Sequence, residues 1–150
     1  MIALFAALQL LLAVTDVPAH EPWIERGLPL RESSGQTTAI SPRGARGLWQ
    51  VMPVAACARL GLGGEQRTGR ARAAFCRAAG EAIAPVWHVP QLGARAGRAV
   101  LHRYLVRCEA RGQGADCALR CYLCGNAGFD PRRCKAGDNY ARDVALLGGR

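Results

Sequence analysis

One glutamate stands where a carboxylic acid could do chemistry. Glu32 is followed by Ser33 and by a loop-like segment rich in Gly, Pro and small polar residues that ends at Pro53. The residues before it predict a short helix over 22–31, so that the negative end of the helix dipole disfavours ionisation of Glu32. Apolar surface from Met52 would raise the pKa of Glu32 further. A carboxyl group in such a setting keeps its proton near neutral pH and can act as a general acid.

The spacing of the residues after this glutamate is specific. The segment 32–53 reads ESSGQTTAISPRGARGLWQVMP, with Ser41 nine residues after Glu32 and an unbroken run from Gly44 to Pro53. It resembles the catalytic segment of the soluble lytic transglycosylase (SLT) family, within the lysozyme-like superfamily. The family pattern is Glu-Ser, a later Ser, and then Gly-Ala-x-Gly-Leu-x-Gln-x-Met-Pro, and every spacing matches without a gap.

A second family segment is matched more loosely. Its usual form is Pro-x-x-Asn-x-x-x-Gly, which Pro90 and Gly97 fit. Gly93 stands where the family has Asn.

Two later segments complete the resemblance, which spans about residues 22–147. ALRCYLCGNAG at 118–128 is similar to the family's Ala-Tyr-Asn-x-Gly segment, but three residues, 123–125, are inserted between Tyr122 and Asn126. Residues 140–144 match the closing Tyr-Val segment.

The resemblance implies a reaction and a set of site residues. A lytic transglycosylase cleaves the MurNAc–GlcNAc β-1,4 bond of peptidoglycan and forms 1,6-anhydro-MurNAc. Glu32 would protonate the bond and then take the proton of the MurNAc 6-hydroxyl, so that neither water nor a second carboxylate is needed. No cofactor or metal is implied. The implied substrate-binding residues are Ser41, Gln50, Met52, Tyr122 and Asn126.

Two other functions stay open on the sequence. A lysozyme or phage-type endolysin on the same fold would be a hydrolase, and would need a positioned water and a second carboxylate such as Asp130 or Asp138. A catalytically inactive peptidoglycan-binding or assembly protein is the other interpretation. It is favoured by Pro29 just before Glu32, by Gly93 and by the insertion after Tyr122.

Hydrophobic periodicity predicts a mainly α chain without a convincing strand. Pro29 is expected to kink or break the first helix near its end. Together with the resemblance, this predicts one lysozyme-like domain over 20–150, built of short helices and an active-site loop. The expected helices cover 22–31, 53–60, 71–84, 95–109, 115–124 and 140–147.

The first residues predict export. Residues 2–14 read IALFAALQLLLAV, an uncharged run too short to span a bilayer but suited to a signal-peptide core. Small residues at 17–19 predict cleavage after Ala19, so that 1–19 is a signal peptide and the mature chain is periplasmic or extracellular. An apolar first helix of the domain and an uncleaved anchor are the alternatives.

The seven cysteines all follow the predicted cleavage site. In an oxidising compartment they form up to three disulfides and leave one thiol over, and the sequence leaves the pairing open. A zinc site of four thiolates is the alternative, which export disfavours. Its ligands would be Cys117, Cys121, Cys124 and Cys134.

The chain is strongly basic, with a net charge of +9. A basic enzyme is attracted to anionic polymers of a bacterial envelope, although arginines on solvated faces would give the same count. No recognisable nucleic-acid-binding motif is present, so we expect no nucleic-acid partner. The expected partners are peptidoglycan glycan strands, and the expected state is a monomer.

Overall fold

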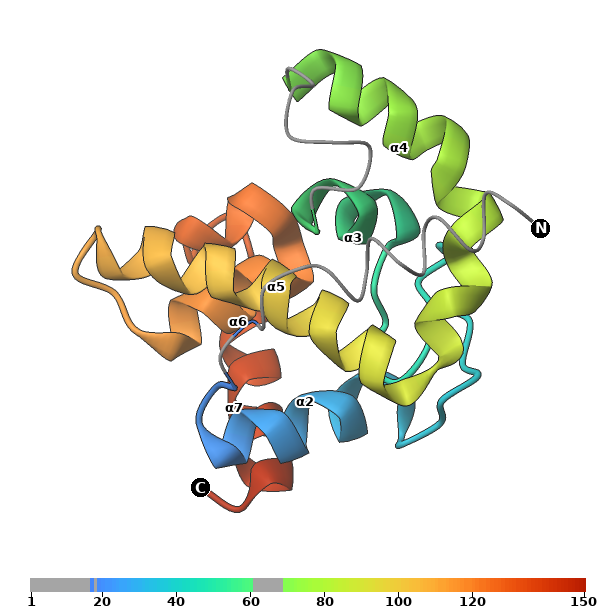
Figure 1. Ribbon diagram of the computed structural model, residues 1–150. Helices are drawn as coiled ribbons and strands as arrows, with labels where there is room; N and C mark the ends of the chain where they lie inside the picture. Colours follow the sequence, from blue (N-terminus) through green and yellow to red (C-terminus); the bar gives the residue numbers. More distant parts are fainter. Residues whose placement is uncertain (1–16, 18, 61–68) are drawn as a thin grey trace.

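The computed structural model describes residues 17, 19–60 and 69–150 (Figure 1). The predicted signal-peptide core at 2–14 lies outside the described residues, so the division into a leader and a domain stays a prediction. The described residues form helices and no extended strand, which confirms the mainly α class. The helices are α2 (Pro22–Ser33), α3 (Pro53–Arg59), α4 (Gly69–Ile83), η1 (Ala84–His88), α5 (Pro90–Glu109), α6 (Ala115–Cys124), η2 (Gly125–Phe129) and α7 (Gly137–Gly148).

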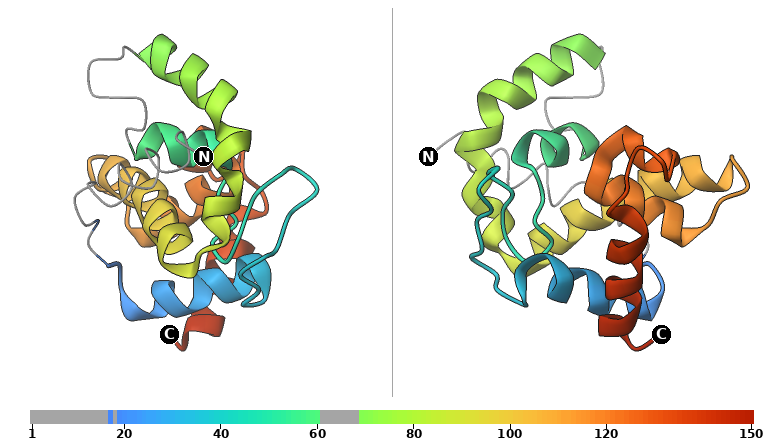
Figure 2. Two further views of the ribbon diagram at one scale, coloured as in Figure 1. Left: turned by 45° about the vertical axis from the view of Figure 1, so that its right-hand side comes forward. Right: turned by 180° about the vertical axis from the view of Figure 1, so that it is seen from behind.

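The helices surround one apolar core. Helix α5 crosses the middle of the molecule, with the pair α3 and α4 on one side of it and the pair α2 and α7 on the other (Figures 1 and 2). Helix α6 packs against both α5 and α7. The largest side chains buried between these layers are Trp49, Trp87, Leu28, Leu101 and Leu119.

The first helix does not break at its proline. Helix α2 continues through Pro29 to Ser33, so the expected break is wrong, while a kink at Pro29 stays a prediction. Proline removes one backbone hydrogen bond in a helix. Here the ring of Pro29 is buried, and the Ser33 hydroxyl contacts the Pro29 carbonyl at 3.0 Å. The helix tolerates the missing bond at this buried position and carries Glu32 in its last turn.

Helix α5 begins five residues earlier than the periodicity predicts. Pro90 occupies its first turn, where a proline costs no hydrogen bond. The next turns carry Gly93 and Gly97, which hide the apolar periodicity. A Cβ on Gly93 would lie 2.6 Å from the Trp87 carbonyl oxygen, and one on Gly97 would overlap the Trp49 ring. Gly93, which replaces the family's Asn, therefore lies where this chain has no room for a side chain.

Three disulfides tie the helices together, and the prediction of three bridges and one spare thiol is confirmed. The spare thiol, Cys121, is buried. Among the described residues, the sulfurs that converge belong to Cys121 and the Cys108–Cys117 pair, which is not the four-thiolate group of the zinc alternative. The bridges are Cys57–Cys76, Cys108–Cys117 and Cys124–Cys134.

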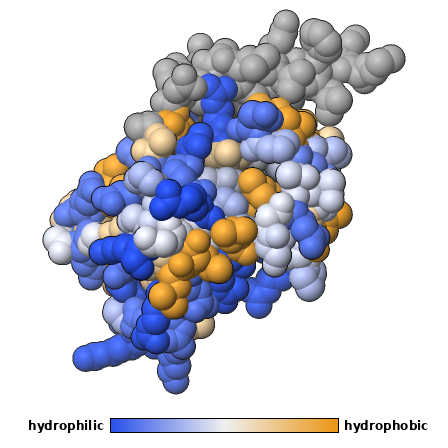
Figure 3. Space-filling model, turned by 90° about the horizontal axis from the view of Figure 1, so that it is seen from below, coloured by the Kyte–Doolittle hydropathy of each residue, from blue (hydrophilic) through white to orange (hydrophobic). Residues whose placement is uncertain are grey.

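The outer face of the α2–α7 pair is mixed in character. Leu30, Leu146 and Leu147 are exposed on these two helices. The molecule seen from that side shows apolar side chains among many hydrophilic ones (Figure 3). Within the described part of the chain, no helix has the length and apolar character needed to cross a membrane.

The closest helix contact gives a stability prediction. A Cβ on Gly27 of α2 would overlap the Val144 carbonyl of α7, which is backbone and cannot swing away. We expect Gly27→Ala to lower the free energy of unfolding by about 3 kcal/mol. Gly69→Ala is the control, since a Cβ there meets nothing within 4 Å, and it should leave stability unchanged or slightly raised. Urea unfolding followed by circular dichroism measures both, and equal effects would contradict this account of the crossing.

Candidate active site

Glu32 lies in the last turn of α2 and faces α7. Its Oε1 accepts a hydrogen bond from the phenol of Tyr140, a side chain that is only 2% exposed. Beside this pair, Arg31 reaches Asp143 of α7 in an ion pair at 3.0 Å. The contact between α2 and α7 thus holds the carboxyl group from one side and leaves it partly accessible from the other.

The environment favours the protonated form of this carboxyl group. Burial is the largest influence and raises the pKa of Glu32, while the Tyr140 hydrogen bond and the charge of Arg31 lower it by less. Burial and the nearby carboxylate raise the pKa of Tyr140 and of Tyr122 well above their usual range. Both phenols therefore keep their protons, and Tyr140 acts as the donor. A carboxyl group that favours its protonated form in this way could act as a general acid.

Helix α6 supplies a third side chain. The hydroxyl of Tyr122 donates to the Trp49 carbonyl at 2.7 Å, and the charge of Glu32 acts on its pKa. The structure therefore brings together Glu32, Tyr122 and Tyr140 from α2, α6 and α7. Tyr122 was among the predicted site residues. Tyr140 was not, although the closing Tyr-Val segment of the family pattern contained it.

The loop that follows Glu32 is fixed to the end of α2. The Ser33 hydroxyl is buried and contacts the Leu48 carbonyl at 2.9 Å. Gly47 has a φ of +72°, and a Cβ there would overlap the Trp87 carbonyl, so this position requires glycine. These contacts explain why the Glu-Ser pair and the Gly-Leu-Trp run occur together.

Two of the predicted substrate-binding residues serve this loop itself. The Ser41 hydroxyl accepts a hydrogen bond from the Ala45 amide at 3.0 Å, which closes a turn. The Gln50 side-chain amide donates to the carbonyls of Ala39 and Gly47 at 3.2 and 2.9 Å. The Gln50 carbonyl oxygen still has acceptor capacity, and a substrate contact by either residue stays a prediction.

The other two predicted contacts lie at the ends of helices. Met52 precedes α3 and is 43% exposed, so its thioether is available to a ligand. Asn126 is exposed in η2, and its Oδ1 accepts a hydrogen bond from Arg107 at 3.0 Å. The inserted residues Leu123–Gly125 separate Asn126 from Tyr122, and the structure engages Asn126 with α5 instead of with Glu32.

The carboxylates that a hydrolase would need are engaged elsewhere. Asp138 pairs with Arg120 at 3.2 Å, and Asp130 accepts from the Arg132 amide at 2.9 Å. Among the described residues, no carboxylate contributes to the shifted pKa of Glu32.

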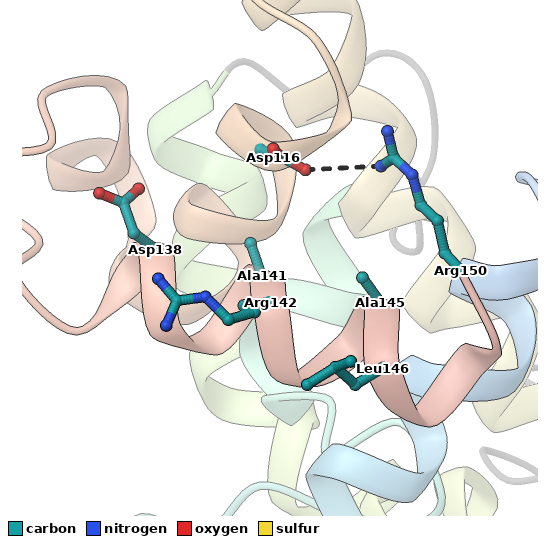
Figure 4. Close-up of a pocket in the computed structure, with 7 residues that line it drawn as sticks. All are labelled: Asp116, Asp138, Ala141, Arg142, Ala145, Leu146 and Arg150. Atoms are coloured by element: carbon teal, nitrogen blue, oxygen red, sulfur yellow. Dashed lines mark ion pairs between the residues drawn. The ribbon is translucent and has the colours of Figure 1, made fainter.

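Two cavities of the described surface lie away from Glu32. One of about 480 Å³ runs along α7 and contains the ion pair of Asp116 and Arg150 at 3.8 Å (Figure 4). Another of about 460 Å³ lies on the other side of the same pair, next to Trp23. Glu32 lines neither cavity. Glu32 and its partners mark the candidate site, because the environment raises the pKa of this buried carboxyl group.

The raised pKa of Glu32 has a consequence for stability. A carboxyl group whose native pKa is raised contributes stability below its unfolded pKa and loses it as the pH rises through the native pKa. The glutamine side chain in Glu32→Gln does not ionise, so this variant does not lose this folding stability as the pH rises. We expect this variant to match the wild type near about pH 4 and to be more stable by about 1 kcal/mol near about pH 8. Thermal unfolding at both pH values measures it, and a variant less stable at the higher pH would contradict a desolvated carboxylate.

Comparison with known families gives a match to the segment that contains Glu32. Residues 13–71 match the model of the transglycosylase SLT domain, and this range includes α2, Glu32 and the whole loop up to α3. No curated protein and no solved structure matches the chain significantly. The matched domain indicates a glycan-cleaving transglycosylase that acts on peptidoglycan. The resemblance to the soluble lytic transglycosylase family is therefore confirmed by the match over residues 13–71.

Proposed function

We propose that this chain is an exported peptidoglycan lytic transglycosylase in which Glu32 is both the general acid and the general base. The observation that carries the proposal is the Glu32 carboxyl group, whose pKa is raised by burial and which is held by the buried phenol of Tyr140. This group lies inside the segment that matches the transglycosylase SLT domain.

The reaction needs one carboxyl group in two protonation states. Glu32 first gives its proton to the oxygen of the MurNAc–GlcNAc bond, and the bond from C1 of MurNAc to that oxygen breaks. The resulting carboxylate then accepts the proton of the MurNAc 6-hydroxyl, whose oxygen bonds to C1. The product is 1,6-anhydro-MurNAc, no water is consumed, and Glu32 has regained its proton.

The surroundings of Glu32 suit this cycle. The pKa raised by burial favours the acid at the start, and the Tyr140 donor stabilises the carboxylate in the middle of the cycle. A retaining glycosidase would place a second carboxyl group about 5 Å from the first. Asp130 and Asp138 are held in other contacts, which supports a transglycosylase over a hydrolase.

Export is part of this proposal. Peptidoglycan lies outside the cytoplasm, and three disulfides are typical of oxidising compartments. The apolar run at 2–14 would direct the chain there, and export after cleavage at Ala19 would leave the described helices intact.

Mass spectrometry of the products from purified peptidoglycan tests the reaction. The mature wild type should release anhydro-muropeptides, and Glu32→Gln should lower their rate of formation by about 1000-fold, because it cannot transfer a proton. Glu109→Gln makes the same chemical change at an exposed position and should keep the wild-type rate.

Each other outcome points to a different function. Reducing-end products from the wild type would indicate a hydrolase, and loss of activity in Asp130→Asn or Asp138→Asn would then identify the second carboxylate. A folded wild type that binds peptidoglycan and releases nothing would indicate a binding or assembly protein.

The role of Tyr140 is tested by the pH dependence of the rate. Its hydrogen bond lowers the pKa of Glu32, so Tyr140→Phe should raise that pKa further. Since activity needs protonated Glu32, the alkaline limb of the rate profile should move to higher pH while the maximal rate falls about 10-fold. Tyr104→Phe, on α5, is the control and should leave the profile in place. A lower rate without a shift of the alkaline limb would assign Tyr140 a structural role only.

A further inference from the structure

A group of arginines gathers where α5 ends, beside the junction of α6 and η2. The guanidinium carbons of Arg107 and Arg111 lie 4.6 and 4.4 Å from the centre of the same ring, that of Phe129. Arg103 lies one turn before Arg107 on α5, and Arg59 ends the neighbouring helix α3. The attraction of both guanidinium groups to the same aromatic ring offsets part of the repulsion between the two like charges.

These guanidinium groups have hydrogen-bond donors to spare. Arg107 donates to Asn126 at 3.0 Å, and Arg111 donates to the Arg107 carbonyl at 2.8 Å. Each guanidinium has several further N–H groups. Within the described part of the chain, no carboxylate forms an ion pair with Arg59, Arg103, Arg107 or Arg111.

Two neighbouring groups are subject to the same positive charge. Burial is the largest influence on the pKa of Arg59 and lowers it, and the charges of Arg103 and Arg107 lower it further. Burial raises the pKa of the Cys121 thiol, and Arg107 and Arg111 are among the charges that oppose this shift. The positive charge therefore acts on groups on both sides of the α5 end.

We propose that Arg107 and Arg111, stacked on Phe129 and flanked by Arg103 and Arg59, bind phosphate groups of an anionic polymer. Guanidinium groups bind phosphate oxygens bidentately, and the shared ring holds two of them in place before the ligand arrives. Arg103 and Arg107 follow each other at about 6 Å along the helix, a spacing that suits charges repeated along a chain. Among the described residues, no hydrogen bond or ion pair joins these four arginines to Glu32 or Tyr140.

The polymer would hold the enzyme on the wall beside its substrate. That it belongs to a bacterial envelope rests on the proposed function, whereas phosphate binding by the arginines does not. The proposal assigns the expected attraction of this basic protein to anionic polymers to one particular site. Most of the other arginines are not required for binding at that site.

Titration with inorganic polyphosphate, followed by calorimetry, tests the site directly. The double variant Arg107→Gln with Arg111→Gln should weaken binding by at least about 10-fold. It should also reduce the slope of log affinity against log salt by about 0.7 for each phosphate group that the variant no longer neutralises. The control is Arg70→Gln with Arg77→Gln, which removes the same charge from exposed positions on α4 and should change affinity less than about 2-fold.

Three results would overturn the proposal. Equal decreases in affinity in the two double variants would mean that net charge alone attracts the polymer. Equal effects on polyglutamate would remove the preference for phosphate, and tighter binding to single-stranded DNA of equal charge would indicate a nucleic-acid site.

Two further measurements keep the test independent of folding and of catalysis. Phe129→Leu keeps every charge, removes the ring on which the guanidiniums stack, and should weaken polyphosphate binding about 3-fold or more. Cleavage of peptidoglycan freed of phosphate polymers should be unchanged in Arg111→Gln, which leaves the bond of Arg107 to Asn126 in place, while cleavage of walls that retain such polymers should slow. Loss of polyphosphate binding with intact cleavage of phosphate-free peptidoglycan would therefore show that this site acts independently of Glu32. Circular dichroism of each variant checks that neither loss results from unfolding.

Discussion

The contact between α2 and α7 is the constraint on which the candidate site depends. Glycines stand at the crossing, and a Cβ on either Gly27 or Gly148 would overlap backbone of the facing helix. Only at this close approach can the phenol of Tyr140, near the start of α7, reach the carboxyl group of Glu32 near the end of α2. The geometry of the candidate site is thus set by backbone packing that lies one or two turns away from Glu32 and Tyr140.

The charges around Glu32 are arranged so that burial has a larger effect on its pKa than they have. Arg31 is its direct neighbour, and an unpaired arginine there would favour the carboxylate. The guanidinium group of Arg31 instead points to Asp143 at 3.0 Å and lies over the Tyr140 ring at 5.4 Å. In a chain with a net charge of +9, this pairing limits how far the nearest cation lowers the pKa of Glu32.

The structure could be predicted best from the sequence where backbone conformation and long-range packing both require the same type of residue. The segment around Gly47 could be recognised because its positive φ and its contact with Trp87 demand glycine. The start of α5 was missed because Gly93 and Gly97 bury backbone against tryptophans and leave no apolar period.

Contacts between residues that lie far apart in the chain could not be predicted from local sequence patterns. The Tyr140–Glu32 bond joins residues 108 positions apart, and neither helix encodes its partner. The pairing of the cysteines was open for the same reason. The insertion after Tyr122 shows the effect of contacts between distant residues. It contains Cys124, whose disulfide to Cys134 fixes the end of α6. Asn126, which follows the insertion, accepts a hydrogen bond from Arg107 of α5. With Cys117 bridged to Cys108 near the other end of α6, disulfides hold the helix that presents Tyr122. The departure from the family pattern therefore adds a covalent support next to Tyr122, while a sugar contact by Asn126 stays a prediction.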